Sequence, residues 1–335
     1  MRTLTVVSES WPIDGSFAIS RGSKTSADVV TVTITDESNN GERITGRGEC
    51  VPYARYGETI ESVIAQIKTQ QALISSTAKS SELRVSLQSM LPSGAARNAV
   101  DCALWDLEAR QTGSRVWQLA GIETPAAVVT AYTLSLDTPE NMHAAAMKYS
   151  SRPLLKLKLA GEGDIERVAA VRDGAPDSRI IVDANESWSV KDYDVLVPKL
   201  YELGVSMIEQ PLPATDDAAL EFVDRPIALC ADESCHDAAG FAKMTSGYDM
   251  INIKLDKTGG LTEALVLQQA AIERELEIMV GCMVATSLAM APATLLTPGA
   301  AVVDLDGPLL LAQDRDHALD YSENLIAPPT PSLWG

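Results

Sequence analysis

The segment LLKLKLAGEGDIERVAAVRDGAPDSRIIVD, residues 154–183, contains the pattern that decides the fold. A short apolar run ends in charged residues, an amphipathic helical stretch follows, and a second apolar run ends in Asp183. This unit recurs from about Pro125 onward, and consecutive units of this kind build a parallel sheet. Eight runs in line predict a barrel, because right-handed crossovers return each strand beside the one before it. The predicted strands are residues 128–130, 154–159, 180–182, 206–208, 227–229, 250–253, 278–280 and 301–303.

The chain before residue 125 has a different pattern of apolar residues. Alternating apolar residues predict an antiparallel sheet there, and stretches with helical spacing follow it. The predicted strands are residues 4–7, 29–35 and 43–49, and the predicted helices are residues 58–74, 81–90 and 94–112. We therefore expect an α+β domain over residues 1–124 and a barrel over residues 125–312. The Pro-rich segment of residues 313–335 is expected to return to the first domain.

Composition limits the classes of partner. The 335 residues are 46% hydrophobic and 22% charged, which excludes a disordered or collagen-like chain. The formal net charge is −19, from 27 basic and 46 acidic residues. Such a field repels phosphate backbones and anionic lipids, so neither a nucleic acid nor a membrane is expected as a partner. The expected ligands are therefore small molecules.

The cysteines and the longest apolar segment indicate a cytoplasmic protein. Five cysteines form no C-x-x-C pair, which predicts reduced thiols. Cys230 and Cys235 beside His236 lack a fourth ligand with usable spacing, so no zinc site is expected. The first residues contain no apolar run typical of a signal peptide. Residues 278–303 carry no charge, but prolines interrupt them, and we interpret them as barrel core rather than a membrane span.

Nearly every predicted barrel strand ends in a charged residue. These residues are Lys156, Lys158, Asp183, Glu209, Asp232 and Lys254, with Asp304 and Asp306 after the last strand. The carboxyl ends of parallel barrel strands share one rim, where barrel enzymes place their active sites, so the side chains should converge. One such residue alone would be interpreted as a helix cap or a solvated side chain. Their recurrence, strand after strand, favours a functional site.

Three of these strand ends carry carboxylates without any His or Cys. Asp183, Glu209 and Asp232 are hard oxygen ligands of the kind that suits Mg²⁺. A divalent cation would also relieve the repulsion between the three negative charges. The sequence therefore predicts one Mg²⁺ ion per subunit.

Lysines flank the predicted metal site. Lys156 and Lys158 are two residues apart on one strand and therefore point to the same side. Lys254 is expected across the barrel mouth from them, an arrangement that indicates two bases. A lysine base needs its pKa lowered from about 10.4 toward roughly 7–8, which a neighbouring ammonium group and a metal ion would favour.

Five motifs contain these residues: Lys156-Leu157-Lys158, Asp183-Ala184-Asn185-Glu186, Glu209-Gln210-Pro211, Ala231-Asp232-Glu233-Ser234 and Ile253-Lys254-Leu255-Asp256-Lys257-Thr258-Gly259-Gly260. Together they closely resemble the enolase superfamily, muconate-lactonizing-enzyme subgroup, over essentially the whole chain. The resemblance implies an α/β fold in which an α+β capping domain precedes a modified (β/α)7β barrel. Asp304-Leu305-Asp306 resembles the D-x-D element of dipeptide epimerases, in particular the L-Ala-D/L-Glu epimerases of murein peptide recycling. Residues 17–24 and 48–53 resemble the specificity loops of that family.

The resemblance implies a Mg²⁺-dependent dipeptide epimerase, with Ala-Glu as the expected substrate. Lys158 and Lys254 would be the two bases of a 1,1-proton transfer at the α-carbon of the C-terminal residue, with Lys156 beside Lys158. Asp304 and Asp306 would bind the α-ammonium group of the dipeptide through charge-assisted hydrogen bonds.

Further residues are expected to contact the substrate. Arg21 and Lys24, two cations in an acidic protein, suit the extra carboxylate of a glutamate side chain. Thr133 is expected to hydrogen-bond the substrate, and Cys282 and Met283 are expected to line the pocket. The alternatives are a solvated loop for Arg21 and Lys24 and a helix or turn cap for Thr133. For Cys282 and Met283 the alternative is packing within the barrel.

Other activities share the same lysines and metal ligands. An N-acylamino-acid racemase, an o-succinylbenzoate synthase or a muconate cycloisomerase would do so, but their substrates lack the ammonium group that two aspartates suit. A non-catalytic binding barrel is a remote alternative, which would predict lost ligands. The sequence leaves open whether the chain forms a homo-oligomer and which lysine serves which enantiomer.

Overall fold

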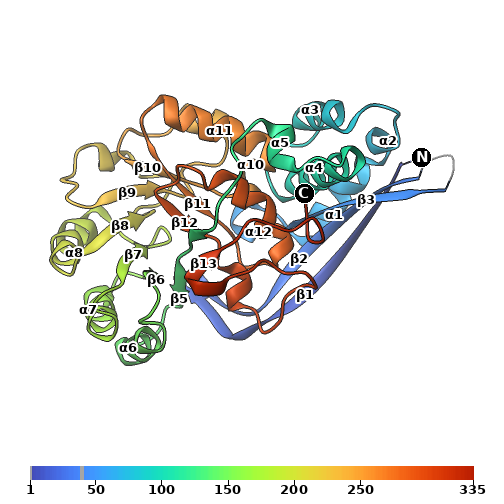
Figure 1. Ribbon diagram of the computed structural model, residues 1–335. Helices are drawn as coiled ribbons and strands as arrows, with labels where there is room; N and C mark the ends of the chain where they lie inside the picture. Colours follow the sequence, from blue (N-terminus) through green and yellow to red (C-terminus); the bar gives the residue numbers. More distant parts are fainter. Residues whose placement is uncertain (1, 38–40) are drawn as a thin grey trace.

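Three antiparallel strands form the sheet of the N-terminal region in the computed structural model, which describes residues 2–37 and 41–335 (Figure 1). They are β1 (Arg2–Ile19), β2 (Gly22–Glu37) and β3 (Arg43–Cys50), in that order across the sheet. Helices pack on one face of this sheet, so the predicted α+β capping region is confirmed. They are α1 (Ile60–Thr69), α2 (Gln71–Ile74), α3 (Ser80–Met90) and α4 (Ala95–Thr112).

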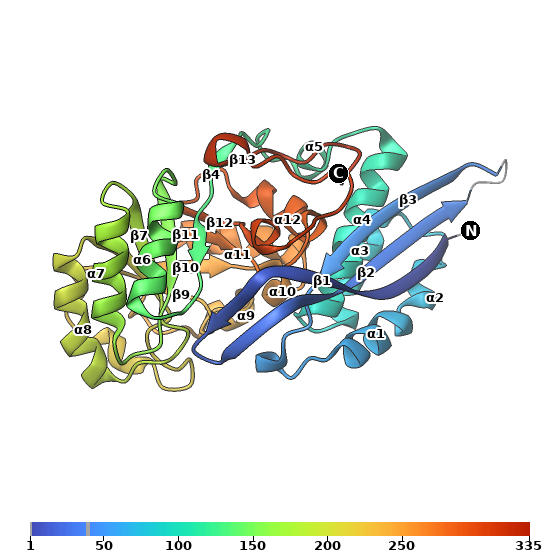
Figure 2. The ribbon, with the colours of Figure 1, turned by 90° about the horizontal axis from the view of Figure 1, so that it is seen from below.

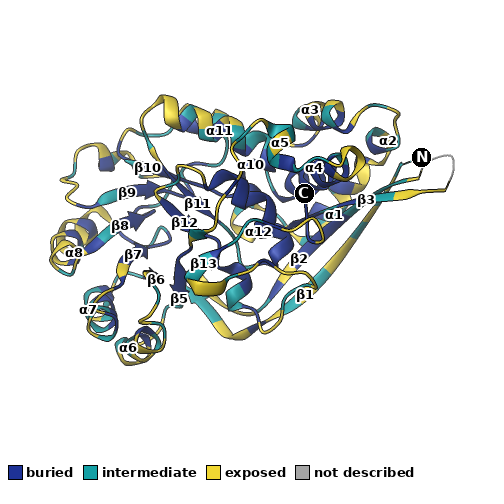
Figure 3. Ribbon diagram, in the orientation of Figure 1, coloured by how far each residue is buried: buried dark blue, intermediate teal, exposed yellow. Residues whose placement is uncertain are grey.

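Two glycines let α4 lie directly on β3. A Cβ atom at Gly46 would lie 2.3 Å from the carbonyl oxygen of Ala103, and one at Gly48 would lie 2.1 Å from that of Ala99. Neither approach is compatible with a side chain, because both obstacles are helix backbone. The close packing buries an apolar core between the sheet and the helices (Figure 3).

Eight parallel strands form the second sheet, and their order follows the sequence. They are β5 (Tyr132–Leu134), β6 (Leu154–Lys158), β7 (Arg179–Asp183), β8 (Val205–Glu209), β9 (Ala228–Ala231), β10 (Met250–Ile253), β11 (Glu277–Gly281) and β12 (Val302–Asp304). Ala131 N donates to Val303 O at 2.8 Å and so joins the two ends of the sheet. The predicted barrel is therefore confirmed, and one buried side chain from each strand region fills its interior.

Helices surround the barrel (Figure 1). They are α6 (Pro139–Lys148), α7 (Asp164–Gly174), α8 (Val190–Glu202), α9 (Ala238–Phe241), α10 (Leu255–Thr258), α11 (Leu261–Glu273) and α12 (Ser287–Ala293), with α5 (Val116–Ala120) before the barrel. Single turns of 3-10 helix are η1 (Ala54–Tyr56), η2 (Ala218–Glu221), η3 (Thr294–Leu296), η4 (Gly307–Leu310) and η5 (Ser322–Asn324). The uncharged segment of residues 278–303 forms β11, α12, η3 and part of β12. Among the described residues, no helix combines the length and apolar character that a bilayer requires.

The predicted first barrel strand, residues 128–130, is wrong. Val128–Val129 form β4, which pairs antiparallel with β13 (Leu325–Ile326) of the C-terminal segment, and the barrel begins instead with β5. The apolar run from residue 126 to residue 134 is long enough for two short strands. Its pattern alone cannot show which of them enters the barrel.

Each end of the chain contacts the other region: the N-terminal hairpin reaches the barrel, and the C-terminal segment reaches the capping helices. Figure 2 shows the β1–β2 hairpin extending from the capping helices to the barrel. At its far end Ile13 pairs with Leu311, and Leu136 N donates to Ala18 O at 3.0 Å. In the opposite direction, the C-terminal segment brings Trp334, fully buried, to α4, where its Nε1 donates to Cys102 O at 3.1 Å. The boundaries near residues 124 and 312 stay predictions.

Candidate active site

The carboxyl ends of the barrel strands bring the predicted charged residues together. Each residue lies within the last three residues of its strand or at most two residues after it, and all of them are buried. They are Lys156 and Lys158 on β6, Asp183 on β7, Glu209 on β8, Asp232 after β9, Lys254 after β10, Asp304 on β12 and Asp306 just beyond it. Buried charges in this number require partners, and each lysine has at least one.

Lys156 lies between three carboxylates. Its Nζ is 2.6 Å from Oε2 of Glu209, 2.7 Å from Oδ2 of Asp304 and 3.5 Å from Oδ2 of Asp183. This single ammonium group therefore connects β7, β8 and β12. Its role in the structure is to hold the acidic residues of three strands in one cluster.

The two predicted bases each pair with a different carboxylate. Lys158 Nζ lies 2.6 Å from Oδ2 of Asp183, and Lys254 Nζ lies 2.7 Å from Oδ2 of Asp232. Lys254 also lies 3.7 Å from Oε1 of Glu209. The structure thus places the bases on β6 and just after β10, four strands apart around the sheet.

Sequence reasoning missed two residues that support this cluster. Lys257 Nζ lies 2.7 Å from Oδ1 of Asp232 and donates to three backbone carbonyl oxygens, so it is a fully bonded structural lysine. Asn252 donates through Nδ2 to Oε1 of Glu209 at 2.7 Å. The position of Lys257, three residues after Lys254 and so one helical turn on, was a usable signal. Asn252 lies inside an apolar strand, where a polar residue is itself a signal.

The lysine pairs determine the ionisation of the cluster. Burial opposes ionisation of Asp183, but Lys158 and Lys156 outweigh it and lower the pKa of Asp183 to about 2. Burial favours neutral Lys254, but Asp232 and Glu209 outweigh it and hold the pKa of Lys254 well above its usual value. The sequence leaves the protonation of Lys254 open, and in this arrangement its nearest neighbours are the anions Asp232 and Glu209, which favour the ammonium form.

The three predicted metal ligands fit a hard cation. Asp183, Glu209 and Asp232 present only oxygen donors, and adjacent carboxylates share an ammonium group between them. Oε2 of Glu209 and Oδ1 of Asp232 accept no hydrogen bond of suitable geometry from the described residues, although an ammonium group lies within 2.7 Å of each. Within residues 2–37 and 41–335, no three Asp, Glu, His or Cys side chains form a ready metal cluster. Lysine ammonium groups lie between the three carboxylates.

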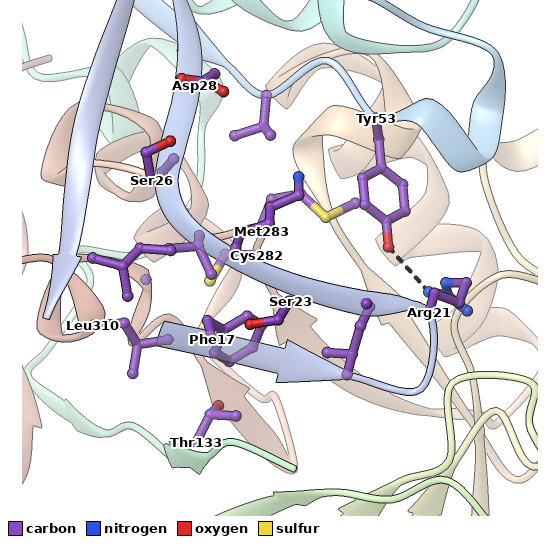
Figure 4. A pocket seen from close by; sticks show the side chains of 18 of the residues that line it. Phe17, Arg21, Ser23, Ser26, Asp28, Tyr53, Thr133, Cys282, Met283 and Leu310 are labelled. Atoms are coloured by element: carbon purple, nitrogen blue, oxygen red, sulfur yellow. Dashed lines mark hydrogen bonds between the residues drawn. The ribbon is translucent and has the colours of Figure 1, made fainter. Parts of the chain in front are cut away.

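A cavity of about 340 Å³ adjoins the cluster, between the β1–β2 hairpin and the barrel (Figure 4). Its walls include all seven residues that were predicted to contact substrate: Arg21, Lys24, Thr133, Cys282, Met283, Asp304 and Asp306. The two bases and the three carboxylate ligands are not among its lining residues. Asp304 lines the cavity and also pairs with Lys156, so the cluster borders the cavity at this residue.

The barrel end of the cavity is acidic. Oδ2 of Asp306 accepts a hydrogen bond from the backbone N of Thr133 at 2.6 Å, which links β5 to the turn after β12. Burial, and next the charge of Asp304, raise the pKa of Asp306 to about 7. Oδ1 of Asp304 is buried and accepts no hydrogen bond from the described residues. This end can accept a cationic group.

Near the turn of the hairpin the cavity is basic, and the one hairpin anion among its lining residues is Asp28, farther along β2. Arg21 donates to the hydroxyl of Tyr53 at 3.0 Å (Figure 4) and to Oε1 of Glu233 at 2.8 Å. Lys24 Nζ lies 6.0 Å from the centre of the Tyr53 ring. Arg55, which sequence reasoning missed, also lines the cavity. It belongs to none of the strand-end motifs, and only the fold brings its 3-10 turn to this place.

Family models cover most of the chain. Residues 1–121 match the mandelate racemase / muconate lactonizing enzyme N-terminal domain, and residues 141–330 match the enolase C-terminal domain-like family. The L-Ala-D/L-Glu epimerase of Escherichia coli is 45% identical over 324 residues, which cover 96% of this chain and 98% of that protein. An N-acetyl-D-glutamate racemase of a Pseudoalteromonas species is 46% identical over 291 residues, which cover 87% and 91%.

Solved structures are similar over the full length. An enolase family member from Agrobacterium tumefaciens with homology to dipeptide epimerases, with bound sodium and L-Ala-L-Glu, has a TM-score of 0.95 and 50% identity over 100% of both chains. A dipeptide epimerase from Enterococcus faecalis, complexed with Mg and L-Leu-L-Tyr, has a TM-score of 0.88 and 28% identity over 97% of this chain and 96% of that one.

Proposed function

The chain belongs to the enolase superfamily, in the mandelate racemase and muconate lactonizing enzyme group, and we propose on this basis that it is a dipeptide epimerase acting on L-Ala-L-Glu and L-Ala-D-Glu. It is an isomerase, because its similar relatives are epimerases and racemases of amino-acid derivatives. The reaction inverts the α-carbon of the C-terminal residue by removing a proton from one face and adding one to the other.

The charge distribution of the cavity is the observation that carries this proposal. Asp304 and Asp306 lie at the barrel end, and Arg21 and Lys24 lie at the hairpin end. A dipeptide with a C-terminal glutamate has an ammonium group at one end and a side-chain carboxylate at the other. The two ends of the substrate therefore match the two ends of the cavity in charge.

Asp183, Glu209 and Asp232 would hold the magnesium ion. When bound, Mg²⁺ acts as a Lewis acid and stabilises negative charge that develops on the substrate carboxylate. The Enterococcus faecalis relative was crystallised with Mg and a dipeptide, which supports the same cofactor here. Among the residues of this chain, the all-oxygen donor set favours Mg²⁺ over softer metals.

Lys158 and Lys254 would move the proton. They approach the cluster from β6 and from the end of β10, so each can serve one face of the α-carbon. For either amine to act as a base it must be neutral, and the one on the opposite side must carry a proton to donate. Lys156, buried between Glu209 and Asp304, would hold the acidic side chains in place.

Racemisation of N-acetylglutamate is the second candidate, and the Pseudoalteromonas relative supports it. This substrate keeps the glutamate side chain but replaces the ammonium group by a neutral acyl group. Asp304 keeps its contact with Lys156, but Asp306 would then be buried without a cationic partner. The two aspartates therefore favour the dipeptide.

Incubation of the purified enzyme with L-Ala-L-Glu and MgCl₂ in D₂O tests the proposal. We expect L-Ala-D-Glu to form and one deuterium to enter the glutamate α-carbon, as measured by chiral chromatography and mass spectrometry. N-acetyl-L-glutamate serves as the competing substrate in a parallel reaction. Faster exchange in N-acetylglutamate than in the dipeptide would contradict the proposal.

We also propose that the enzyme recycles murein peptides in the cytoplasm, as the resemblance to L-Ala-D/L-Glu epimerases implies. All five cysteines are free thiols, which supports a reducing compartment. Size-exclusion chromatography with light scattering would show whether the chain forms a homo-oligomer.

A further inference from the structure

The two predicted bases are held by different parts of the fold. Lys158 is the last residue of β6, where it pairs with Asp183 of β7 in the strand ladder. Lys254 follows the last residue of β10 and begins α10, which is a single helical turn. One turn of helix does not keep its shape alone, because fixing it costs more conformational entropy than its own hydrogen bonds offset. The position of Lys254 therefore depends on contacts that other elements make with α10.

Helix α4 of the capping region lies beside α10 and supplies such contacts (Figure 1). Asn98 of α4 donates through Nδ2 to Oδ1 of Asp256 at 2.8 Å. The same carboxylate oxygen accepts from the backbone N of Val51, which follows β3, at 3.1 Å. Asn98 is 2% exposed and Asp256 is 7% exposed, so these hydrogen bonds are made away from water, where they are strong. The capping region thus holds the residue two positions after Lys254.

Two further residues on the same face of α4 hold the end of α10 and the start of α11. Arg97 donates to the backbone oxygens of Thr258 at 2.6 Å and of Gly259 at 3.2 Å, carbonyl groups that a helix end leaves without partners. Asp101 accepts from the backbone N of Thr262 at 3.0 Å and from its hydroxyl at 2.6 Å. Both α4 side chains are buried. The turn between α10 and α11 is therefore bonded to α4 on both of its sides.

Two glycines allow this close approach. Gly259 and Gly260 have φ of 78° and 110°, which residues with side chains rarely adopt. A Cβ atom at Gly259 would lie 2.4 Å from Nε of Arg97, and one at Gly260 would lie 2.6 Å from Cβ of Asp101. The glycine pair in the sequence motif around Lys254 therefore serves the contact with α4.

We propose that α4 positions Lys254 for proton transfer through the face that carries Arg97, Asn98 and Asp101. These three are positioning residues, because none of them is among the lining residues of the cavity. Lys158, by contrast, is held by the barrel strands. The inference rests on the proposed function and gives the capping region a part in one of its two proton transfers. Loosening the contact should therefore impair transfer on one face of the α-carbon only.

Deuterium exchange without inversion distinguishes the two bases. The rates of inversion in the two directions are tied by the equilibrium constant, so damage to either base lowers both alike. Exchange of the α-proton with D₂O without inversion needs only one base, because the lysine that removes the proton can return a deuteron to the same face. The epimer that still exchanges in Lys254→Ala is therefore the epimer that Lys158 deprotonates.

Asn98→Ala should show the asymmetry of Lys254→Ala in a weaker form. For the epimer that Lys158 deprotonates, inversion should fall about tenfold while exchange without inversion stays within about twofold of the wild type, so the ratio of exchange to inversion rises. For the other epimer both rates should fall about tenfold. Chiral chromatography and mass spectrometry measure these rates. Equal losses of exchange in the two epimers, or undiminished inversion, would overturn the proposal.

Asp106→Asn is the matched control, because Asp106 is a buried polar residue of α4 whose partners lie away from α10. It accepts from the backbone N of Arg47 at 2.9 Å and from that of Gly335 at 2.8 Å. The variant should lower Tm without changing the ratio of exchange to inversion in either epimer. A changed ratio in this control would show that any loosening of α4 has the same effect, and would contradict a specific role of the Asn98 face.

A double-mutant cycle shows whether Asn98 acts through Asp256. Asp256→Ala removes both contacts of the carboxylate and should shift the ratio in the same epimer, at least as far as Asn98→Ala does. The double variant Asn98→Ala/Asp256→Ala should be no worse than Asp256→Ala alone. Additive losses, or a shift in the opposite epimer, would contradict the proposed contact.

Hydrogen exchange tests the contact without any substrate. In Asn98→Ala, amides of residues 254–262 should exchange faster while those of β6 keep their protection. Unchanged exchange in that turn would overturn the proposal even if the dipeptide activity is real. If the wild type epimerises no dipeptide, the proposed function fails, and this measurement still decides whether α4 holds the turn.

Discussion

The strand-end cluster and the hairpin end of the cavity differ in which parts of the fold supply the oppositely charged partners. In the cluster, neighbouring barrel strands position lysines and carboxylates that pair with one another inside the barrel. At the hairpin end, Arg21 and Arg55 from the capping region meet Glu186 and Glu233 from barrel loops, and their side chains stay partly exposed. The proposed reacting groups are therefore positioned mainly within the barrel. The position of the hairpin end of the cavity depends instead on how the capping region packs against the barrel.

The largest effect should come from the cluster, through Glu209. Glu209→Gln keeps the shape of the side chain but removes one of three carboxylates, so detectable epimerisation should disappear because the metal is no longer held. Product formation by chiral chromatography and metal content by mass spectrometry measure this. Glu202→Gln, at an exposed helix end, is the control and should retain full activity. Wild-type turnover in Glu209→Gln, or in chelator-treated enzyme, would remove the cluster from the mechanism.

The next-largest loss of activity is expected when either of the two predicted bases is removed. Lys158→Ala and Lys254→Ala should each lower epimerisation by roughly 10²–10⁴-fold, because one face of the α-carbon loses its acid or base. Each variant should still exchange the α-proton of one epimer with solvent deuterium, and the two variants should differ in which epimer that is. Full epimerase activity in either variant, or conversion without deuterium uptake, would show that the assignment is wrong.

A smaller effect belongs to the acidic end of the cavity. Asp306→Asn should weaken all dipeptides alike by roughly 10–100-fold, the equivalent of about 1.5–3 kcal/mol for a charge-assisted hydrogen bond. Burial and the charge of Asp304 raise the pKa of Asp306 to about 7, so the carboxylate is ionised mainly above that pH. KM should therefore rise as the pH falls from 8 to 6 in the wild type and stay flat in Asp306→Asn. An identical pH dependence of KM in both proteins would contradict this.

The smallest effect tests the hairpin end as a whole. The wild type should prefer Ala-Glu over Ala-Leu or Ala-Lys by about tenfold in kcat/KM, equivalent to about 1.4 kcal/mol. The variant Arg21→Gln/Lys24→Gln should lose that preference, since both hairpin cations are then neutral. Competition between labelled dipeptides in one reaction measures the ratio directly. Equal wild-type rates on acidic and basic dipeptides would exclude acidic selection by this end.

The same two regions explain what could be predicted from the sequence. Strand ends of a parallel barrel meet by topology alone, so Lys158, Asp183 and Lys254 could be placed near one another from spacing. Arg55 could not, because its place depends on how a capping turn docks on the barrel. The first barrel strand was misplaced since two short apolar strands occur in succession. The protonation of Lys254 could not be predicted from the sequence either, because it depends on the 2.7 Å contact with Asp232, which only the fold creates.

The pairing of Ile13 with Leu311 has a consequence for how the protein acquires its activity. One wall of the cavity comes from residues made at the start of synthesis, and the opposite wall, around Asp304 and Asp306, comes from residues made near its end. Contacts so distant in the chain form late, because closing a long loop carries a high entropic cost. On refolding from denaturant, the secondary structure should return before the cavity can bind a ligand. A ribosome-bound chain that ends before residue 304 can form most of the barrel, but it lacks the cavity wall around Asp304 and Asp306 and should therefore not bind a dipeptide.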